Sequence, residues 1–391
     1  MSAAPRHFFL VATEESGDRL GADLMRALRM KFGNGMSFSG VGGAAMEQAG
    51  LRSLFPAYEI AIVGFVEIAR RLRFLLRRIR ETADAVIAAN PDVLIIIDSP
   101  DFTHRVARIV RKRAPHIPII NYVSPTVWAW RPGRARAMKT YIDHVLALLP
   151  FEPQAHQRLQ GPPCTYVGHP LLNRLNDLRP IHEDEQRRAE APPLVLMLPG
   201  SRRSEVRRLM PIFGRALAQA SATCGPFEIV LPTLPHLENM VRELCTDWLL
   251  PPRIVIGEEA RYALFRQARA ALVKSGTVTL ELALSGIPMV AAYKVSPLEA
   301  AVARRLITIP TVILANLVIG QRAVPEFLLE HCTAKNLAPA LCAIIKEGEA
   351  RARQIKAFTE IDAIMSTHGV APSECAAEAV MRVIGEERAA R

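Results

Sequence analysis

The segment Ala271–Pro288 combines a strand pattern with small polar residues and an acid, at spacings that suit nucleotide binding. The apolar run before Ser275-Gly276-Thr277 predicts a buried strand, and the residues after it, as far as Leu284, predict a helix. The N–H groups at the start of such a helix favour an anion. Glu281 lies one turn further on the same face, where a carboxylate can accept both hydroxyl protons of a ribose. On spacing alone, an ordinary turn with Glu281 on a solvated face is the preferred explanation, and the nucleotide site needs further support.

A second acid, Asp98, follows Val93–Ile97, the clearest strand pattern in the chain. Ligands of α/β proteins bind at the carboxyl ends of parallel strands, so a carboxylate there is placed to act as a general base. The alternative is that Asp98 caps a helix that begins near Phe102. Asp101 suits capping better, so we assign Asp98 as the base and Asp101 as the cap.

Two further positions are weaker candidates. In the turn 199–202, Gly200 allows close approach of the backbone, Ser201 can cap or bind, and Arg202 offers a planar donor for a phosphate. The turn lacks the spacing of a P-loop, and a solvated loop arginine is the simpler explanation of Arg202 alone. Asn316 is polar within an apolar, strand-like run, and it can equally be a turn residue.

Other chemistries have no support in the sequence. The histidines show no metal-ligand spacing, and no G-x-S-x-G segment is present, so we expect no metal site, no cofactor and no serine nucleophile. The formal charge of +11 favours anionic partners: nucleic acid, an anionic membrane face or phosphorylated substrates. Because no nucleic-acid-binding motif occurs, we expect no nucleic-acid partner.

Length and composition predict a globular protein with two domains, because the chain has 391 residues, of which 50% are hydrophobic. No apolar run is long enough to cross a bilayer. Residues 1–6 lead directly into a strand without a signal-peptide pattern, so we expect a cytoplasmic protein. The cysteines are scattered, which favours reduced, buried thiols.

Strand-like runs alternate with helical patterns along the chain, which predicts an α/β protein with parallel sheets. His7–Ala12 is the first expected strand, and a polar turn separates it from a helix over Arg19–Phe32. The polar stretch Asn176–Pro193 predicts an interdomain linker, after which the pattern restarts. Both halves open with a strand, a turn of small residues and a helix, which indicates two Rossmann-like domains.

The stretch Phe65–Ile79 departs from this pattern. One helical stripe carries its large apolar residues, and arginines occupy most of the remaining positions. The membrane-contact candidates on the stripe are Phe65, Ile68, Leu72, Leu75 and Leu76. A basic helix with such a face is typical of an interfacial membrane helix, whereas packing on its own sheet is the commoner arrangement.

Several motifs taken together resemble the lipid-A-disaccharide synthase family, in family order from about residue 7 to about residue 330. The segment from Tyr122 to Arg131 is the most specific of them. The matching residues are Ser16-Gly17-Asp18 with Gly21, Gly40-Val41-Gly42-Gly43 with Met46, Ile97-Asp98-Ser99-Pro100-Asp101-Phe102, Tyr122-Val123-Ser124-Pro125 with Val127-Trp128-Ala129-Trp130-Arg131, Val167-Gly168-His169-Pro170, Leu198-Pro199-Gly200-Ser201-Arg202, Ser275-Gly276-Thr277 with Glu281, and Asn316-Leu317.

The resemblance implies the glycosyltransferase B fold, with two Rossmann-like domains facing across a cleft, and inverting glycosyl transfer without a metal. The implied donor is UDP-2,3-diacylglucosamine, and the implied acceptor is 2,3-diacylglucosamine 1-phosphate (lipid X). The products are a β-1,6-linked disaccharide precursor of lipid A and UDP. The resemblance also favours the interfacial explanation of Phe65–Ile79, since both substrates carry acyl chains. We therefore expect peripheral association with an anionic inner-membrane surface on its cytoplasmic face, and a homodimer remains open.

Roles carried over from the family fall on the motif residues. Asp98 would take the proton of the acceptor 6-hydroxyl, and Glu15 would join it in the catalytic site. The first loop departs from the family pattern at Thr13-Glu14-Glu15, so Glu14 is an alternative to Glu15. Gly200, Ser201 and Arg202, with Ser275, Gly276 and Thr277, would bind the diphosphate, and Glu281 the ribose. Ser16, Gly17, Asp18 and Asn316 would be further active-site positions.

The expected domains are an acceptor- and membrane-facing domain over 1–178, a UDP-sugar-binding domain over 190–368, and a C-terminal helix over 369–391 that packs on the first domain. Two other functions stay open at this point. Another UDP-sugar transferase, or a UDP-sugar epimerase of the same fold, would use the same nucleotide site. A non-catalytic membrane adaptor would explain the basic helix and the positive charge alone.

Overall fold

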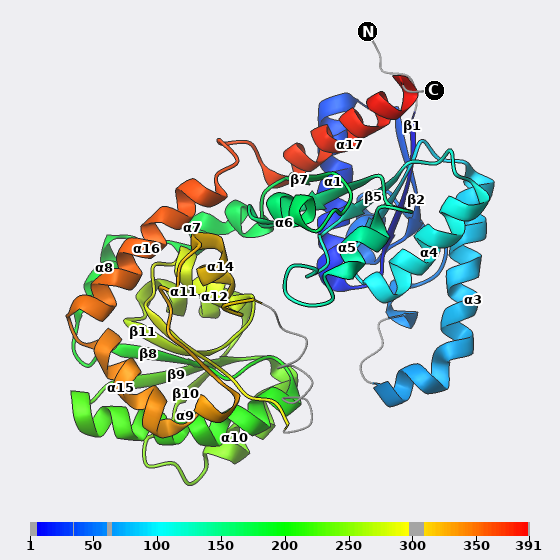
Figure 1. Ribbon diagram of the computed structural model, residues 1–391. Coiled ribbons are helices and arrows are strands. Elements are labelled where there is room, and N and C mark those ends of the chain that lie inside the picture. Colours follow the sequence, from blue (N-terminus) through cyan, green and yellow to red (C-terminus); the bar gives the residue numbers. More distant parts are fainter. Residues whose placement is uncertain (1–5, 34, 61–64, 297–308, 390–391) are drawn as a thin grey trace. The chain divides into compact units, whose positions relative to one another are not determined.

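Runs of aliphatic residues build two parallel β-sheets, one in each of two units of the chain (Figure 1). The computed structural model describes residues 6–33, 35–60, 65–296 and 309–389, and it describes side chains in those ranges except at 65–71 and 387–389. The first unit contains Met1–Leu172 and Ser366–Arg391, and the second contains Asn173–Met365.

The described part of the first unit forms a seven-stranded sheet in the order β3-β2-β1-β4-β5-β6-β7, with every neighbouring pair parallel. The strands are β1 (Arg6–Ala12), β2 (Met36–Val41), β3 (Arg52–Ser53), β4 (Val93–Ile97), β5 (Ile119–Tyr122), β6 (His144–Ala147) and β7 (Cys164–Tyr166). Its helices are α1 (Glu15–Phe32), α2 (Ala44–Gln48), α3 (Phe65–Ala89), α4 (Pro100–Arg113), α5 (Gly133–Met138), α6 (Glu152–Arg158) and α17 (Pro372–Ala389).

Helices cover both faces of this sheet, which explains why its central strands are continuous hydrophobic runs. Phe8 and Leu10 of β1 face a core that α1, α2 and α17 share. Phe9 and Val11 face the opposite core, beneath α3 and α4. The C-terminal helix α17, red in Figure 1, packs against α1 and therefore belongs to the first unit.

The described part of the second unit forms a six-stranded parallel sheet in the order β10-β9-β8-β11-β12-β13. The strands are β8 (Leu194–Leu198), β9 (Glu228–Thr233), β10 (Arg253–Ile256), β11 (Ala270–Lys274), β12 (Met289–Tyr293) and β13 (Glu326–Leu328). Its helices are α7 (Leu175–Leu178), α8 (His182–Ala189), α9 (Arg203–Cys224), α10 (Glu238–Cys245), α11 (Glu258–Gln267), α12 (Val278–Leu284), α14 (Leu314–Ile319), α15 (Ala334–Ile345) and α16 (Glu349–Met365).

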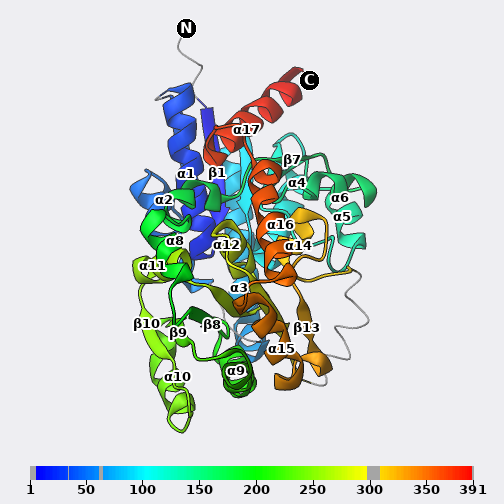
Figure 2. The ribbon, with the colours of Figure 1, turned by 90° about the vertical axis from the view of Figure 1, so that its left-hand side faces the viewer.

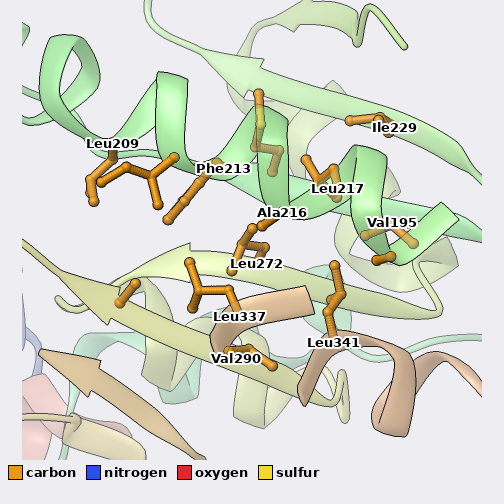
Figure 3. Packing of buried hydrophobic residues seen from close by; sticks show 14 of the residues in the cluster. Val195, Leu209, Phe213, Ala216, Leu217, Ile229, Leu272, Val290, Leu337 and Leu341 are labelled. Atoms are coloured by element: carbon orange, nitrogen blue, oxygen red, sulfur yellow. The ribbon is translucent and has the colours of Figure 1, made fainter. Parts of the chain in front are cut away.

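Helices α9 and α15 lie side by side on one face of the second sheet (Figure 2). One buried cluster contains Phe213 and Leu217 of α9, Leu337 and Leu341 of α15, and Leu272 of β11 (Figure 3). All five side chains are buried, so this layer fixes α9 against the strands whose ends form the site described below.

The linker interpretation of Asn176–Pro193 is wrong, because most of that stretch forms α7 and α8 and belongs to the second unit. Asp184 of α8 is buried and accepts hydrogen bonds from Arg266 Nε at 3.0 Å and Gln267 Nε2 at 3.1 Å of α11. Polar residues that suggested a linker, such as Asp184, thus form contacts within the second unit. The chain passes between units at Leu172–Asn173 and again at Met365–Ser366.

Three local expectations also change. The first helix begins at Glu15 rather than Arg19, so the acidic residues of its first turn lie at the end that favours negative charge. Asn316 lies in helix α14 and not in a strand. Asp101 lies inside α4, whose N-cap position is occupied by Ser99, so Asp101 is not the cap.

Helix α3 divides along its length. Phe65 and Ile68 lie outside the described side chains. Leu72 is 45% exposed, whereas Leu75 and Leu76 pack partly against the core of the first unit and Ile79 is buried in it. The apolar face of α3 thus continues into the protein core at Leu75 and Leu76, which share their surface between core and solvent. Membrane contact by this stripe stays a prediction. No helix in the described ranges is both long enough and apolar enough to cross a membrane.

Candidate functional site

Each sheet has one point where the strand order reverses: between β1 and β4 in the first unit, and between β8 and β11 in the second. The connections after these neighbouring strands leave in opposite directions, so a crevice opens at their carboxyl ends, where ligands of such folds bind. The turn at 13–14 and Asp98 follow the first pair of strands. The turns at 199–202 and 275–277 follow the second. Topology therefore brings the predicted site residues together within each unit.

Asp98 lies in a sharply turned backbone. Asp98 and Ser99 have φ angles of 52° and 44°, in the left-handed region that non-glycine residues rarely adopt. Thr103 Oγ1 donates to the main-chain oxygen of Asp98 at 2.7 Å, and the Ser99 N–H donates to Asp98 Oδ1 at 2.8 Å. The strained turn holds the carboxylate beside the start of α4.

The structure distinguishes Glu14 from Glu15. Ser99 Oγ donates to Glu14 Oε1 at 3.0 Å, which links Glu14 to the turn that carries Asp98. Glu15 lies on α1 and pairs with Arg19, one helical turn later, at 2.6 Å, with its side chain 79% exposed. Glu14 is therefore the acid linked to the turn that carries Asp98, whereas Glu15 points away from it, because α1 begins one turn earlier than predicted. The catalytic role of either acid stays a prediction.

Asp18 has a structural role. Its carboxylate accepts hydrogen bonds from the backbone N–H groups of Gly43 at 2.7 Å, Ala45 at 2.9 Å and Met46 at 3.1 Å, at the start of α2. A Cβ atom on Gly43 would lie 2.7 Å from Asp18 Oδ2, so only glycine fits there. Of the other two predicted positions in this turn, Gly17 is buried between the helix and the sheet, and Ser16 is exposed.

A cavity of about 220 Å³ surrounds Asp98 in the first unit. Its charged residues are Asp98, Arg131 and Arg134, and its wall includes Trp130 and the buried His104. Burial, helped by the charge of Arg134, lowers the pKa of His104 to about 3, so this imidazole is neutral at physiological pH. A separate cavity of about 700 Å³ includes Glu14, Glu15 and Asp18 in its lining.

The second unit contains a cavity of about 660 Å³ at the ends of β8 and β11. Its lining includes all the predicted nucleotide-binding residues except Ser275: Gly200, Ser201, Arg202, Gly276, Thr277 and Glu281. Its volume lies within the roughly 300–1,000 Å³ typical of small-molecule sites.

Glu281 is a half-buried acid with an unsatisfied oxygen. Its Oε2 has no hydrogen-bond partner among the described residues, and Arg261 Nη2 lies 3.6 Å away, within ion-pair range but too far for a hydrogen bond. Burial raises the pKa of Glu281, and Arg261 partly offsets that effect. A buried carboxylate oxygen without a donor is costly, so this geometry suits a ligand that supplies hydroxyl protons.

Glu205 occupies the anion position in the turn after β8. Its Oε2 accepts from the N–H groups of Ser201 at 3.3 Å and Arg202 at 3.4 Å, and its Oε1 lies 3.2 Å from both Arg202 Nη1 and Lys274 Nζ. Burial alone would raise the pKa of Glu205, but Lys274 and Arg202 outweigh it and hold the pKa below the usual value. Gly200 has a φ of 123°, and a Cβ atom there would lie 2.5 Å from Glu205 Oε2. The turn thus gathers positive charge around one carboxylate.

Ser275 and Asn316 are buried and bind their own chain. Ser275 Oγ donates to the carbonyl oxygen of Val312 at 3.1 Å. The Asn316 amide donates to Thr311 Oγ1 at 3.2 Å and to Val324 O at 2.9 Å, and it accepts from Val324 N at 2.8 Å. These side chains bind residues 311, 312 and 324 of their own chain, and they do not line the cavity.

Sequence reasoning named Glu14 only as an alternative to Glu15. It assigned no site role to the charged residues Glu205, Lys274, Arg261, Arg131 and Arg134. Glu205 stands three residues after Arg202, a spacing typical of helix capping, which was a usable signal. Lys274 directly precedes Ser275, but its partner Glu205 lies on α9, which follows a different strand, β8. Among the described residues, no group of three or more His, Cys, Asp or Glu side chains is arranged to hold a metal ion.

Solved structures with the same fold include the UDP-GlcNAc 2-epimerase of Neisseria meningitidis bound to UDP-GlcNAc, with a TM-score of 0.61 and 12% identity over 96% of this chain and 99% of that one. The calicheamicin glycosyltransferase CalG4 is also similar, with a TM-score of 0.58 and 17% identity over 98% of this chain and 99% of that one. At such low identity the likeness shows the fold alone: two Rossmann-like units of the glycosyltransferase B type.

Sequence comparison is far more specific. The family model for lipid-A-disaccharide synthetase matches residues 8–380. The lipid-A-disaccharide synthase of Rhodopseudomonas palustris strain BisB18 is 58% identical over 97% of this chain and 96% of its own length. That of Nitrobacter hamburgensis is 57% identical over 98% of this chain and 97% of its own length. These matches cover both units, and they show that the chain belongs to the lipid-A-disaccharide synthase family.

Proposed function

We propose that this protein joins UDP-2,3-diacylglucosamine and 2,3-diacylglucosamine 1-phosphate into the β-1,6-linked disaccharide 1-phosphate of lipid A biosynthesis. The acceptor 6-hydroxyl oxygen attacks the anomeric carbon of the donor, and the bond from that carbon to the diphosphate breaks. UDP leaves with the bonding electron pair, and the hydroxyl proton passes to a protein base. Membership of the family is the observation that carries this proposal.

The second unit holds the donor nucleotide in this proposal. Glu281 accepts hydrogen bonds from the ribose hydroxyl groups, using the carboxylate oxygen that has no partner in the described structure. The diphosphate binds at the N-terminus of α9, beside Arg202 and Lys274. It takes the place of the Glu205 carboxylate, which holds these donors together in the absence of nucleotide. Positive charge at the diphosphate stabilises the departing UDP.

The first unit supplies the base. Asp98 stands at the end of β4 in a cavity with two arginines, and Glu14 is tied to the same turn through Ser99. A carboxylate fixed by a strained turn is ready to accept a proton without moving. We assign the base to Asp98, because Glu14 reaches this turn only through the Ser99 hydroxyl.

Two other functions receive less support. The solved structures of similar fold include an epimerase, but only at 12% identity. The two relatives described above, at 57–58% identity, are both lipid-A-disaccharide synthases. A UDP-sugar epimerase or another UDP-sugar transferase is therefore not favoured. A purely adaptor role leaves both crevices and the unsatisfied Glu281 oxygen without a purpose.

A radiolabelled assay tests the function directly. We expect the purified protein to release UDP from UDP-2,3-diacylglucosamine and to form a disaccharide 1-phosphate only when the monosaccharide acceptor is present. An epimerase would act on the donor alone, and an adaptor would release no UDP. Either result would overturn the proposal.

Asp98→Asn should lower kcat by about 10²- to 10⁴-fold, because it removes the base, and should leave UDP affinity unchanged. Glu14→Gln should also lower kcat, by a smaller factor. Glu15→Gln is the matched control, since its exposed pair with Arg19 lies outside this turn, and we expect nearly normal activity. Steady-state kinetics check all three variants. Normal kcat in Asp98→Asn would place the proton acceptor elsewhere.

Glu281→Ala and Arg202→Ala should each weaken UDP binding by about tenfold or more, because each removes charge-assisted hydrogen bonds. Arg203→Ala is the control for Arg202, since Arg203 is exposed beside it and lies outside the cavity lining. Calorimetric titration with UDP measures the effect. If Glu281→Ala binds UDP normally, the ribose assignment fails.

We also propose that α3 attaches the protein to the cytoplasmic face of an anionic membrane. Leu72 and the arginines at 73, 77 and 80 are exposed, and each basic side chain near such a surface contributes about 1 kcal/mol. Leu72→Ser should reduce binding to anionic vesicles at an unchanged melting temperature. Ile79→Ala is the contrasting variant, because it should cost roughly 2–5 kcal/mol of folding free energy.

Co-sedimentation with vesicles at increasing salt measures this attachment, which should weaken as ionic strength rises. Leu249→Ser is the matched control, because Leu249 is a 92% exposed leucine of the second unit. Vesicle binding that is equal for Leu72→Ser and Leu249→Ser would exclude α3 as the attachment site.

A further inference from the structure

We propose that Arg131 and Arg134 bind the phosphomonoester group of the acceptor, in the cavity that also holds Asp98. The inference rests on the proposed function, because that function supplies an acceptor with a phosphate at one end of its sugar and the reacting hydroxyl at the other. It adds the residues that recognise the phosphate and thereby place the hydroxyl at Asp98.

The first observation is that these two arginines lack anionic partners. Within the described part of the chain, neither guanidinium group forms an ion pair or a hydrogen bond with another side chain. Three arginines of α4 and α5 are engaged instead: Arg111 pairs with Asp143, Arg113 with Asp84, and Arg136 donates to Gln160. Two unpaired guanidinium groups in one cavity leave positive charge that an anionic ligand can neutralise.

The second observation is that the rest of the cavity wall does not neutralise that charge. His104 is neutral, and its ring nitrogens lie 3.0 Å from Tyr141 Oη and 3.1 Å from Asn121 Oδ1. The Asn121 amide donates to Val123 O at 2.9 Å, which orients its oxygen towards His104. Asp98 is therefore the single carboxylate in the cavity lining, against two guanidinium groups.

The third observation is that a fixed turn presents the arginines. Arg131 has a φ of 53°, and its carbonyl oxygen accepts from the N–H of Arg134 at 2.9 Å as α5 begins. The Arg131 guanidinium stacks over the Trp130 ring at 4.5 Å, and Trp130 Nε1 donates to Thr126 Oγ1 at 2.9 Å. Pre-organised donors of this kind lose little entropy when they bind an anion.

The cavity volume also suits one phosphorylated sugar. At about 220 Å³ it is smaller than the roughly 300–1,000 Å³ of typical drug-sized sites, so it accommodates a polar headgroup and not the acyl chains. When the phosphate lies at the arginines, the sugar ring fixes how far the hydroxyl reaches towards Asp98. The same arrangement disfavours acceptors that lack the phosphate.

Arg131→Gln and Arg134→Gln test the proposal, with Arg136→Gln as the matched control. Arg136 lies on the same helix as Arg134 but outside this cavity. We expect the KM of the phosphorylated acceptor to rise by about 10- to 100-fold in each variant, with the KM of the UDP-sugar unchanged. Arg134→Lys should recover part of the loss, and Arg136→Gln should behave as wild type.

A binding measurement separates this proposal from the proposed function, because it needs no turnover. In calorimetric titrations, wild-type protein should bind glucosamine 1-phosphate more tightly than glucosamine, and Arg134→Gln should lose that preference. Equal binding of the two sugars by wild type would overturn the inference. Weaker UDP binding by Arg134→Gln, with unchanged sugar-phosphate binding, would assign the arginines to the donor and also overturn it.

Discussion

The reversal of strand order in each sheet is the constraint on which the sites depend. In a parallel sheet, the connections after two neighbouring strands block the carboxyl edge unless they leave in opposite directions. They do so between β1 and β4 and again between β8 and β11. Glu14, Asp98, Arg202 and Lys274 all lie within a few residues of those four strand ends. Both faces of these strands are buried, so the strands themselves position the polar residues that follow them.

Part of this arrangement is readable from the sequence for a simple reason. A strand buried on both faces must be a continuous apolar run, and the first polar residue after it must lie at the sheet edge. Asp98 and the Ser275-Gly276-Thr277 turn are predictable on that basis, and so are the α/β class and the paired Rossmann-like units. The family resemblance, confirmed by relatives that cover nearly the whole chain, adds the activity.

The rest depends on contacts that no local pattern reports. Glu205 and Lys274 come together because β8 and β11 are neighbours, although nearly seventy positions separate them in the chain. Asp18 and Asn316 match family motifs, yet their polar groups bind backbone atoms of their own unit. Glu14 and Glu15 are adjacent, but Glu14 precedes α1 and contacts Ser99, whereas Glu15 is the first residue of α1 and faces solvent. A local sequence pattern does not place the start of a helix to within one residue.

Helix α17 has a consequence for biosynthesis. The core beneath α1 includes Val380 and Ile384, so that face of the first sheet stays incomplete until the last helix has left the ribosome. The second unit is a single stretch, Asn173–Met365, and all its strands are available earlier. Domains generally fold as they emerge during synthesis. In this chain the unit that starts first therefore finishes last, and the second unit is in effect a domain inserted into the first.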